Sequence, residues 1–222
     1  MEQPAVSAIV LAGGASSRMG FNKAFARLGQ GGTLIEKAVA KVAMLSPDVI
    51  VVANDEETYR NLGVRVSPDV YPGTGSLGGI YSGLLAAQHQ HALVVACDMP
   101  FLSLPLWRHM LSIPRDYDVL LPRLHGQPEP LHAIYSKRCV GPIKDLLERG
   151  RLKIIGFLHR VKVRFLDEVE IDQFDPEHRS FFNVNRPEEL ARAAALWPDS
   201  EETGAPQRSP RRGASSDGDG AR

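Results

Sequence analysis

The chain has 222 residues, and its 26 basic and 26 acidic side chains leave no formal net charge, which argues against a dedicated nucleic-acid binder. A hydrophobic content of 43% suffices for the core of one ordinary domain. The sequence has no apolar run near the roughly 18 residues of a membrane helix, and no basic leader that would indicate a secretory signal. The only cysteines, Cys97 and Cys139, exclude a disulfide framework, so we expect a cytoplasmic protein.

Short apolar runs alternate with helical patterns along the chain. Thr33 and Glu36 form a capping-box pair, Ser103 is a helix cap, and Pro187 stands at the first turn of a helix. In chain order we predict a strand at 8–11, a helix at 33–45, strands at 49–53 and 64–67, a helix at 79–88, a strand at 93–97, a helix at 103–111, strands at 118–121 and 131–135, a helix at 140–149, a strand at 161–165 and a helix at 187–196.

This alternation predicts an α/β fold. Continuous apolar strands indicate a doubly wound, mostly parallel mixed sheet covered on both faces, a three-layer α/β/α domain over residues 1–197. Residues 198–222 contain no aromatic residue and no aliphatic residue beyond alanine, so we expect a disordered tail. Sheets of this kind bind ligands beyond the carboxyl ends of their strands. The polar turns at Gly13, Asn54 and Asp98 follow such ends, and we expect them to line one crevice.

The segment LAGGASSRMGFNKA, residues 11–24, follows the first predicted strand. It fits neither the dinucleotide fingerprint G-x-G-x-x-G nor the P-loop G-x-x-x-x-G-K-[ST]. Its glycines nevertheless let backbone N–H groups approach an anion closely, and Arg18 and Lys23 can neutralise phosphates. The alternative interpretation is a tight turn whose charged side chains are solvated.

Several polar residues are candidates for ligand contacts. The position of Asp98 after a buried strand suits a Mg²⁺ ligand, a helix cap or a buried hydrogen bond. The Asp69 carboxylate suits the N1–H and amino donors of guanine, or a turn. Cys97 is expected to be a packed strand residue and not a nucleophile.

Glycine and asparagine residues form two further candidate sites. Gly78 and Gly79 are predicted to open a helix, whose N-terminus favours an anion. Asn183 and Asn185 offer amide donors and acceptors that suit a pterin edge or an acceptor phosphate, or they belong to an ordinary strand-to-helix turn.

Five blocks of the sequence, in the same order, resemble the MobA family of molybdenum cofactor guanylyltransferases. The resemblance spans about residues 8–196 and departs from the usual family pattern at Asn22, where aspartate is common, and at Ser76, where proline is common. The blocks are LAGGASSRMGFNKA, DVYPGTGSLGGIYSGL, VVACDMPFL, GQPEPLHAIYSKRC and FFNVNRPEEL.

The resemblance implies a nucleotide-diphospho-sugar-transferase-like Rossmann variant that transfers GMP from GTP to the terminal phosphate of molybdopterin-bound molybdenum and releases pyrophosphate. It implies catalytic roles for Lys23, Arg18 and Asp98, with Mg²⁺ on Asp98. It leaves molybdoenzymes or other cofactor-biosynthesis proteins open as partners, and neither nucleic acid nor a membrane is expected. Implied nucleotide contacts are Leu11, Ala12, Gly13, Lys23, Asn54, Asp69 and Asp98, and implied acceptor contacts are Gly78, Gly79, Asn183 and Asn185.

Three alternative functions stay open at this point. One is the cytidylyl version of the same reaction, and another is a sugar-phosphate nucleotidyltransferase, since the first block is shared widely. The third is a non-catalytic carrier of a nucleotide or of the cofactor. Release of pyrophosphate under multiple turnover separates the enzymes from the carrier.

We predict that the chain shortened to residues 1–197 keeps its melting temperature and its turnover, because the deleted segment has no large apolar side chain to bury. Thermal melting and pyrophosphate release, compared with those of the full chain, measure both. A loss of several degrees or of most of the turnover would show that the tail docks on the domain.

Overall fold

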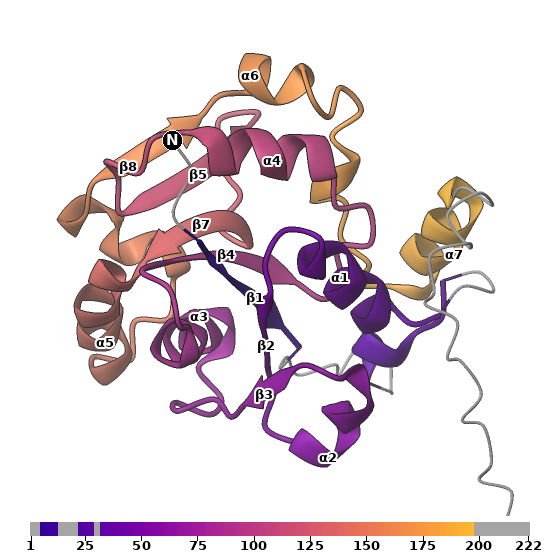
Figure 1. The fold of residues 1–222 in the computed structure, drawn as a ribbon, viewed down its shortest axis with the longest axis horizontal. Helices are drawn as coiled ribbons and strands as arrows, with labels where there is room; N and C mark the ends of the chain where they lie inside the picture. The colour runs from indigo at the N-terminus through magenta and orange to yellow at the C-terminus, as the bar shows by residue number, and fades with distance from the viewer. Residues whose placement is uncertain (1–4, 13–21, 29–31, 198–222) are drawn as a thin grey trace, which may run out of the picture.

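The computed structural model describes residues 5–12, 22–28 and 32–197 (Figure 1). The strands are β1 (Ser7–Leu11), β2 (Asp48–Val52), β3 (Arg65–Ser67), β4 (His91–Ala96), β5 (Val119–Leu124), β6 (Gln127–Pro128), β7 (His132–Ser136) and β8 (Val163–Leu166). The α-helices are α1 (Leu34–Ala43), α2 (Glu56–Tyr59), α3 (Gly75–Ala86), α4 (Leu104–Ser112), α5 (Val140–Glu148), α6 (Glu168–Asp172) and α7 (Pro187–Leu196). The 3₁₀ helices are η1 (Lys23–Phe25), η2 (Arg60–Leu62), η3 (Lys137–Cys139), η4 (Ile154–Arg160) and η5 (Arg179–Phe181).

One eight-stranded sheet has the order β3-β2-β1-β4-β7-β5-β6, with β8 paired to β5. The pairs β1–β2, β1–β4, β2–β3 and β5–β8 are parallel. Strand β7 is antiparallel to both β4 and β5. The predicted mixed, mostly parallel sheet is therefore confirmed. Because β7 reverses direction between them, β4 and β5 end at the same edge of the sheet as β1 and β2.

Strand side chains alternate between two cores, as expected for a sheet buried on both faces. Ala8 and Val10 of β1 belong to the core that includes residues of α1 and α4, whereas Ile9 and Leu11 belong to the core with α3 and α5. The ribbon shows these helices on opposite sides of the sheet, in three layers (Figure 1). A third, smaller cluster joins α7 to the start of α1 through Leu34 and Ala193.

Most predicted elements and caps are confirmed within a few residues. The Thr33–Glu36 capping box is present, and the Ser103 hydroxyl accepts from the Leu106 N–H. The expected helix start at Gly79 is wrong, because α3 begins at Gly75. The dense glycines of this segment are typical of a loop, yet Gly79 packs inside the helix, where a Cβ would lie 3.1 Å from Leu11 Cδ2.

Hydrophobic periodicity in the sequence does not reveal the shortest elements. Helices α2 and α6 and strand β6 have too few residues for a period to show, and none of them was predicted. Within the described ranges, no helix is both long and apolar enough to span a membrane. The expected tail at 198–222 lies outside the described residues, and the domain limit at residue 197 stays a prediction.

Helix α3 lies close against β1 because it presents glycine to that strand. A Cβ built on Gly83 would lie 2.6 Å from Cγ2 of Ile9, a fully buried residue of β1. We predict that Gly83→Ala lowers the free energy of unfolding by about 1–2 kcal/mol, since overpacking outweighs the gain in helix propensity. Denaturant titration of the two proteins measures the difference.

Gly141 in α5 provides the matched control, because a Cβ at that position meets nothing within 4 Å. Gly141→Ala is expected to change the free energy of unfolding by less than about 1 kcal/mol, because the gain in helix propensity is opposed by the restriction that Pro142 places on the residue before it. A Gly83→Ala protein as stable as Gly141→Ala would contradict the close approach of α3 to β1.

Candidate active site

The turns after β1, β2 and β4 meet at one edge of the sheet. Leu11, the last residue of β1, is in register with Val52 of β2 and with Ala96 of β4. Beyond that register, the Ala12 N–H donates to the Val52 carbonyl at 3.1 Å, and the Cys97 N–H donates to the Leu11 carbonyl at 3.1 Å. The three strand ends therefore lie side by side, and the expectation that the turns after them line one crevice stays a prediction. Gly13 and Arg18 lie outside the described residues.

Lys23 is the centre of this edge. Its Nζ donates to Asp98 Oδ2 at 2.5 Å and to Asn185 Oδ1 at 2.9 Å. The Lys23 and Asp98 side chains are only 21% and 12% exposed, so water screens their attraction less than it would on the surface. The Val184 N–H donates to the Asp98 carbonyl at 2.9 Å, which holds Asn185 beside the pair. The structure therefore brings together three of the predicted site residues.

Asn22 positions Lys23 by capping η1. Its Oδ1 accepts from the Ala24 N–H at 3.1 Å, while its Nδ2 donates to the Tyr59 hydroxyl at 3.0 Å. That hydroxyl donates in turn to the Ala12 carbonyl at 3.3 Å. Burial raises the pKa of Tyr59, so the phenol remains a donor. An aspartate at position 22 would lack the amide N–H, and this departure therefore creates a link between η1 and the end of β1.

Asp98 has one carboxylate oxygen available for a cation. Oδ2 accepts from Lys23, whereas Oδ1 is buried and has no hydrogen-bond partner among the described residues. A buried, unpaired carboxylate oxygen is unfavourable, and oxygen is the ligand atom that Mg²⁺ prefers. The Asp98 carboxylate thus fits the divalent cation that the family resemblance implies at this residue.

Cys97 precedes this carboxylate and is a packed residue. Its side chain is buried in the core shared with α1 and α4. Burial, with a smaller contribution from the Asp98 charge, raises the pKa of the thiol to about 12. The thiol is therefore protonated at neutral pH, which agrees with the expectation that it is not a nucleophile.

Asn54 and Asp69 are hydrogen-bonded to each other. The Asp69 N–H donates to Asn54 Oδ1 at 2.9 Å, and Asp69 Oδ1 accepts from the Tyr71 N–H at 3.1 Å and the Ser82 hydroxyl at 2.9 Å. Asp69 therefore stabilises a turn, which is one of the two roles that the sequence analysis considers for its carboxylate. Its contact with a nucleotide base stays a prediction.

Three of the residues expected to contact the acceptor have packing or hydrogen-bonding roles within the protein. Gly78 is packed so tightly that a Cβ would lie 3.1 Å from both Asp69 Oδ1 and the Tyr71 carbonyl. Asn183 Nδ2 donates to the Phe181 carbonyl at 3.1 Å, which leaves Asn185 as the member of the pair that contacts Lys23. Acceptor binding by Gly78, Gly79, Asn183 and Asn185 stays a prediction.

A cavity of about 530 Å³ is lined in part by Phe181 and Phe182, the two residues that directly precede Asn183. Sequence reasoning did not predict it, because residues from four separate segments form its wall. The FFNVNR block offered a partial signal, since its two phenylalanines precede Asn183 and both line the cavity. The wall combines aromatic, cationic and acidic side chains, and Arg179 is ion-paired with Glu177 at 2.6 Å. Its other members include Phe101, Phe181, Phe182, Arg192 and Glu129.

Comparison with known proteins identifies the family. Residues 8–162 match the MobA-like NTP transferase domain. The chain belongs to the MobA-like NTP transferase family. This MobA-like transferase is 38% identical over 189 residues to a probable molybdenum cofactor guanylyltransferase from Pelotomaculum thermopropionicum, covering 85% of this chain and 91% of that one. It is 37% identical to the molybdenum cofactor guanylyltransferase of Desulfosudis oleivorans, covering 86% and 95% of the two chains.

A solved structure supports this family assignment. The molybdopterin-guanine dinucleotide biosynthesis protein A from Archaeoglobus fulgidus superposes with a TM-score of 0.75 at 29% identity, covering 86% of the MobA-like transferase and 98% of that protein. The family expected from the five sequence blocks and the three-layer nucleotidyltransferase fold are both confirmed.

We predict that Lys23→Ala in this MobA-like transferase weakens binding of a nucleoside triphosphate and slows transfer, with little change in melting temperature. Charge-assisted contacts of this kind are worth roughly 1.5–3 kcal/mol, which corresponds to about 10–150-fold in affinity. Calorimetric titration with the triphosphate and single-turnover kinetics measure the two effects.

Lys144→Ala is the matched control, since Lys144 is a half-exposed lysine on α5, where it pairs with Glu148 at 3.6 Å. This variant is expected to bind and react like the unmodified protein. Unchanged affinity together with an unchanged rate in Lys23→Ala would remove Lys23 from the site.

Proposed function

We infer that this chain is a molybdenum cofactor guanylyltransferase. It transfers GMP from GTP to the terminal phosphate of molybdopterin-bound molybdenum, forming the guanine dinucleotide cofactor and releasing pyrophosphate. The observation that carries this inference is the Lys23–Asp98–Asn185 cluster, which lies at the ligand-binding edge of a fold whose curated relatives bear that name.

The chemistry needs no side-chain nucleophile. The acceptor phosphate is already ionised and attacks the α-phosphate of GTP, so catalysis consists of positioning and of stabilising charge. Cys97 remains a thiol and takes no part. We propose that Lys23, held by Asp98 and Asn185, stabilises the departing pyrophosphate together with Arg18 and the backbone amides that begin at Gly13.

Asp98 is the residue that we propose to hold Mg²⁺, through its unpaired Oδ1. The bound ion supplies positive charge against the several negative charges of GTP and the acceptor. The ion pair with Lys23 keeps the carboxylate oriented, because Oδ2 is anchored at 2.5 Å while Oδ1 is available.

We propose that the nucleotide lies across the ends of β1 and β2. Leu11 and Ala12 contact it mainly through backbone, and Asn54 and Asp69 contact it from the neighbouring turn. Asp69 Oδ1 is committed to the turn, so Oδ2 is the atom proposed to accept from guanine N1–H and the amino group. Cytosine presents acceptors on the matching edge, and a carboxylate would repel them.

The acceptor is proposed to occupy the cavity of about 530 Å³. Rings such as Phe101 and Phe182 suit a flat pterin, and Arg179 and Arg192 suit its anionic groups. Asn183 and Asn185 would contact the acceptor phosphate between this cavity and Lys23, and Gly78 and Gly79 are proposed to contact the same substrate. We also propose a cytoplasmic location, since both cysteines are free thiols.

We predict that Asp98→Asn folds normally while transfer falls by at least about a hundredfold, the scale of one major electrostatic contribution. Asparagine keeps the size of the side chain and much of its hydrogen bonding but removes the negative charge that attracts a cation. Pyrophosphate release over a magnesium titration, with GTP and molybdenum-molybdopterin as substrates, measures the loss, and a thermal melt checks the fold.

Asp145→Asn serves as the control, because Asp145 is a partly exposed residue of α5 that pairs with Arg160 at 2.8 Å. Near-normal turnover of Asp98→Asn at low magnesium would contradict the metal role. The same assay run with CTP and with sugar phosphates separates the related transferases, and an absence of multiple turnover with every substrate would indicate a carrier.

A further inference from the structure

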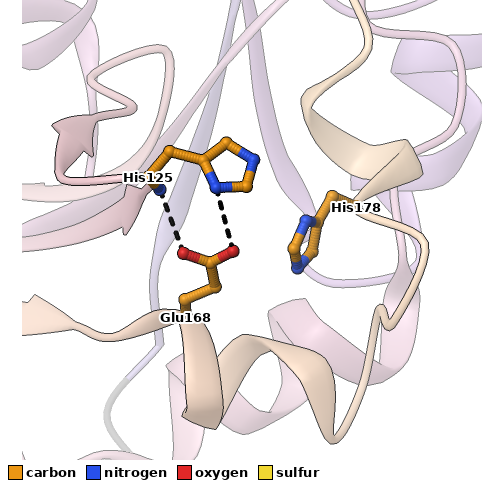
Figure 2. Close-up of side chains that lie close together, drawn as sticks. All are labelled: His125, Glu168 and His178. Atoms are coloured by element: carbon orange, nitrogen blue, oxygen red, sulfur yellow. Dashed lines mark hydrogen bonds and ion pairs between the residues drawn. The ribbon is translucent and has the colours of Figure 1, made fainter.

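Two histidines and a glutamate lie together at the far side of the same sheet edge. His125 is in the turn between β5 and β6, Glu168 is the first residue of α6, and His178 lies just before η5. One ligand atom from each lies within 4.8 Å of the others. Figure 2 shows the three side chains converging from separate segments. No other trio of possible metal ligands is this close among the described residues, and the reaction proposed above uses none of these three.

The sheet itself brings His125 and Glu168 together. Strands β5 and β8 are parallel neighbours, so the turn after β5 and the start of α6 after β8 emerge side by side. An ion pair between Arg123 and Asp167, at 3.0 Å, joins the two segments just before His125 and Glu168. The His125 N–H donates to Glu168 Oε2 at 3.0 Å, and His125 Nδ1 lies 3.1 Å from Oε1 (Figure 2). Both carboxylate oxygens therefore face His125.

His178 is oriented by a carboxylate outside the trio. Its Nε2 donates to Asp172 Oδ1 at 2.6 Å. Histidines that bind metals commonly donate their second ring nitrogen to a carboxylate, which selects the tautomer whose other nitrogen carries the lone pair. With Nε2 engaged by Asp172, Nδ1 of His178 is the atom suited to a metal.

The backbone at the two histidines is unusual. His125 and His178 have φ values of 48° and 53°, and no other non-glycine residue in the described ranges has a positive φ. Such conformations carry strain for residues with a side chain, and they concentrate at functional sites. At position 125 the turn continues with Gly126, at φ 75°, in a two-residue hairpin where asparagine or glycine is the usual choice. Two of the three residues, His125 and His178, therefore occupy strained backbone positions, and both have an imidazole side chain.

We propose that His125, Glu168 and His178 bind a zinc ion. Two imidazole nitrogens and one carboxylate oxygen are the ligand set that zinc accepts, whereas Mg²⁺ and Ca²⁺ prefer oxygen alone. Zinc bonds of about 2.0–2.1 Å in a tetrahedral site place ligand atoms about 3.3 Å apart. The His125 Nδ1 and Glu168 Oε1 atoms are 3.1 Å apart, within hydrogen-bond distance, and zinc would take the place of the proton between them with little change in that separation. The His125 side chain is 79% exposed, so it can rotate to close the remaining gap to His178.

The zinc ion joins two segments of one cavity wall to helix α6. His125 and His178 both line the cavity of about 530 Å³ described above. Binding fixes the β5–β6 turn against α6 and against the segment before η5, and it leaves the fourth zinc position for water or for an anionic group of a ligand. This site is separate from Asp98 and from the cation proposed there, but it shares the cavity proposed for the acceptor, so zinc binding is measured directly and without substrate.

Zinc binding to the full chain tests the proposal. The protein is freed of metal by dialysis against a chelator and then titrated with Zn²⁺ in competition with a chromophoric chelator. We expect one tightly bound zinc ion per chain and a raised melting temperature. His125→Ala, Glu168→Gln and His178→Ala should each weaken binding by at least about 10-fold, and Asp172→Asn should weaken it by about the same factor.

Two control variants keep the test specific. His159→Ala removes an exposed histidine of η4, and Asp98→Asn removes the other candidate cation ligand; both should bind zinc as tightly as the unmodified chain. X-ray absorption at the zinc edge should show nitrogen and oxygen ligands without sulfur. The proposal is overturned if no stoichiometric zinc binds, or if the three ligand variants bind it as tightly as the controls do.

Discussion

The contact between Lys23 and Asp98 is the interaction on which the rest of the site depends. A cation and a carboxylate lie 2.5 Å apart with little exposure to water, and such a pair is stable only when hydrogen bonds hold both partners in place. The surrounding structure supplies that support: Asn22 caps the helix that carries Lys23, and Val184 and Asn185 lie against Asp98 and Lys23. The pair holds the Lys23 ammonium where phosphates are proposed to bind, next to a carboxylate oxygen that still lacks a partner.

The sheet makes this pair possible by joining distant parts of the chain. Lys23 is separated from Asp98 by 75 residues and from Asn185 by 162, so no local segment contains the site. Parallel pairing of β4 with β1 places the end of one strand beside the start of the turn that leads to Lys23. The last cluster of the core, with Leu34 and Ala193, then fixes α7 near α1 and carries Asn185 into position.

The sequence allowed the fold class and the main ligand candidates to be predicted, because both depend on local signals. Apolar runs mark the buried strands, and the Thr33–Glu36 pair marks the start of α1. Gly78 and Gly79 misled the placement of α3, since a glycine-rich loop and a helix packed tightly against a strand share one composition. The Tyr59 link from Asn22 to Ala12, and the meeting of His125 with His178, depend on tertiary contacts that no sequence period encodes. For the same reason, no metal site was predicted at His125 or His178, which stand far apart in the sequence.

Strand β7 runs against both of its neighbours, and this reversal divides the working edge of the sheet into two halves. One half consists of turns after β1, β2 and β4, and the other of turns after β5 and β8. The β7 ladder is not their only connection, because the segment that follows β8 crosses back to the first half, where the Val184 N–H donates to the Asp98 carbonyl and Asn185 accepts from Lys23. A change in the loops after β5 and β8 is therefore transmitted to Lys23 and Asp98 through this returning segment, so the two halves of the edge respond to each other.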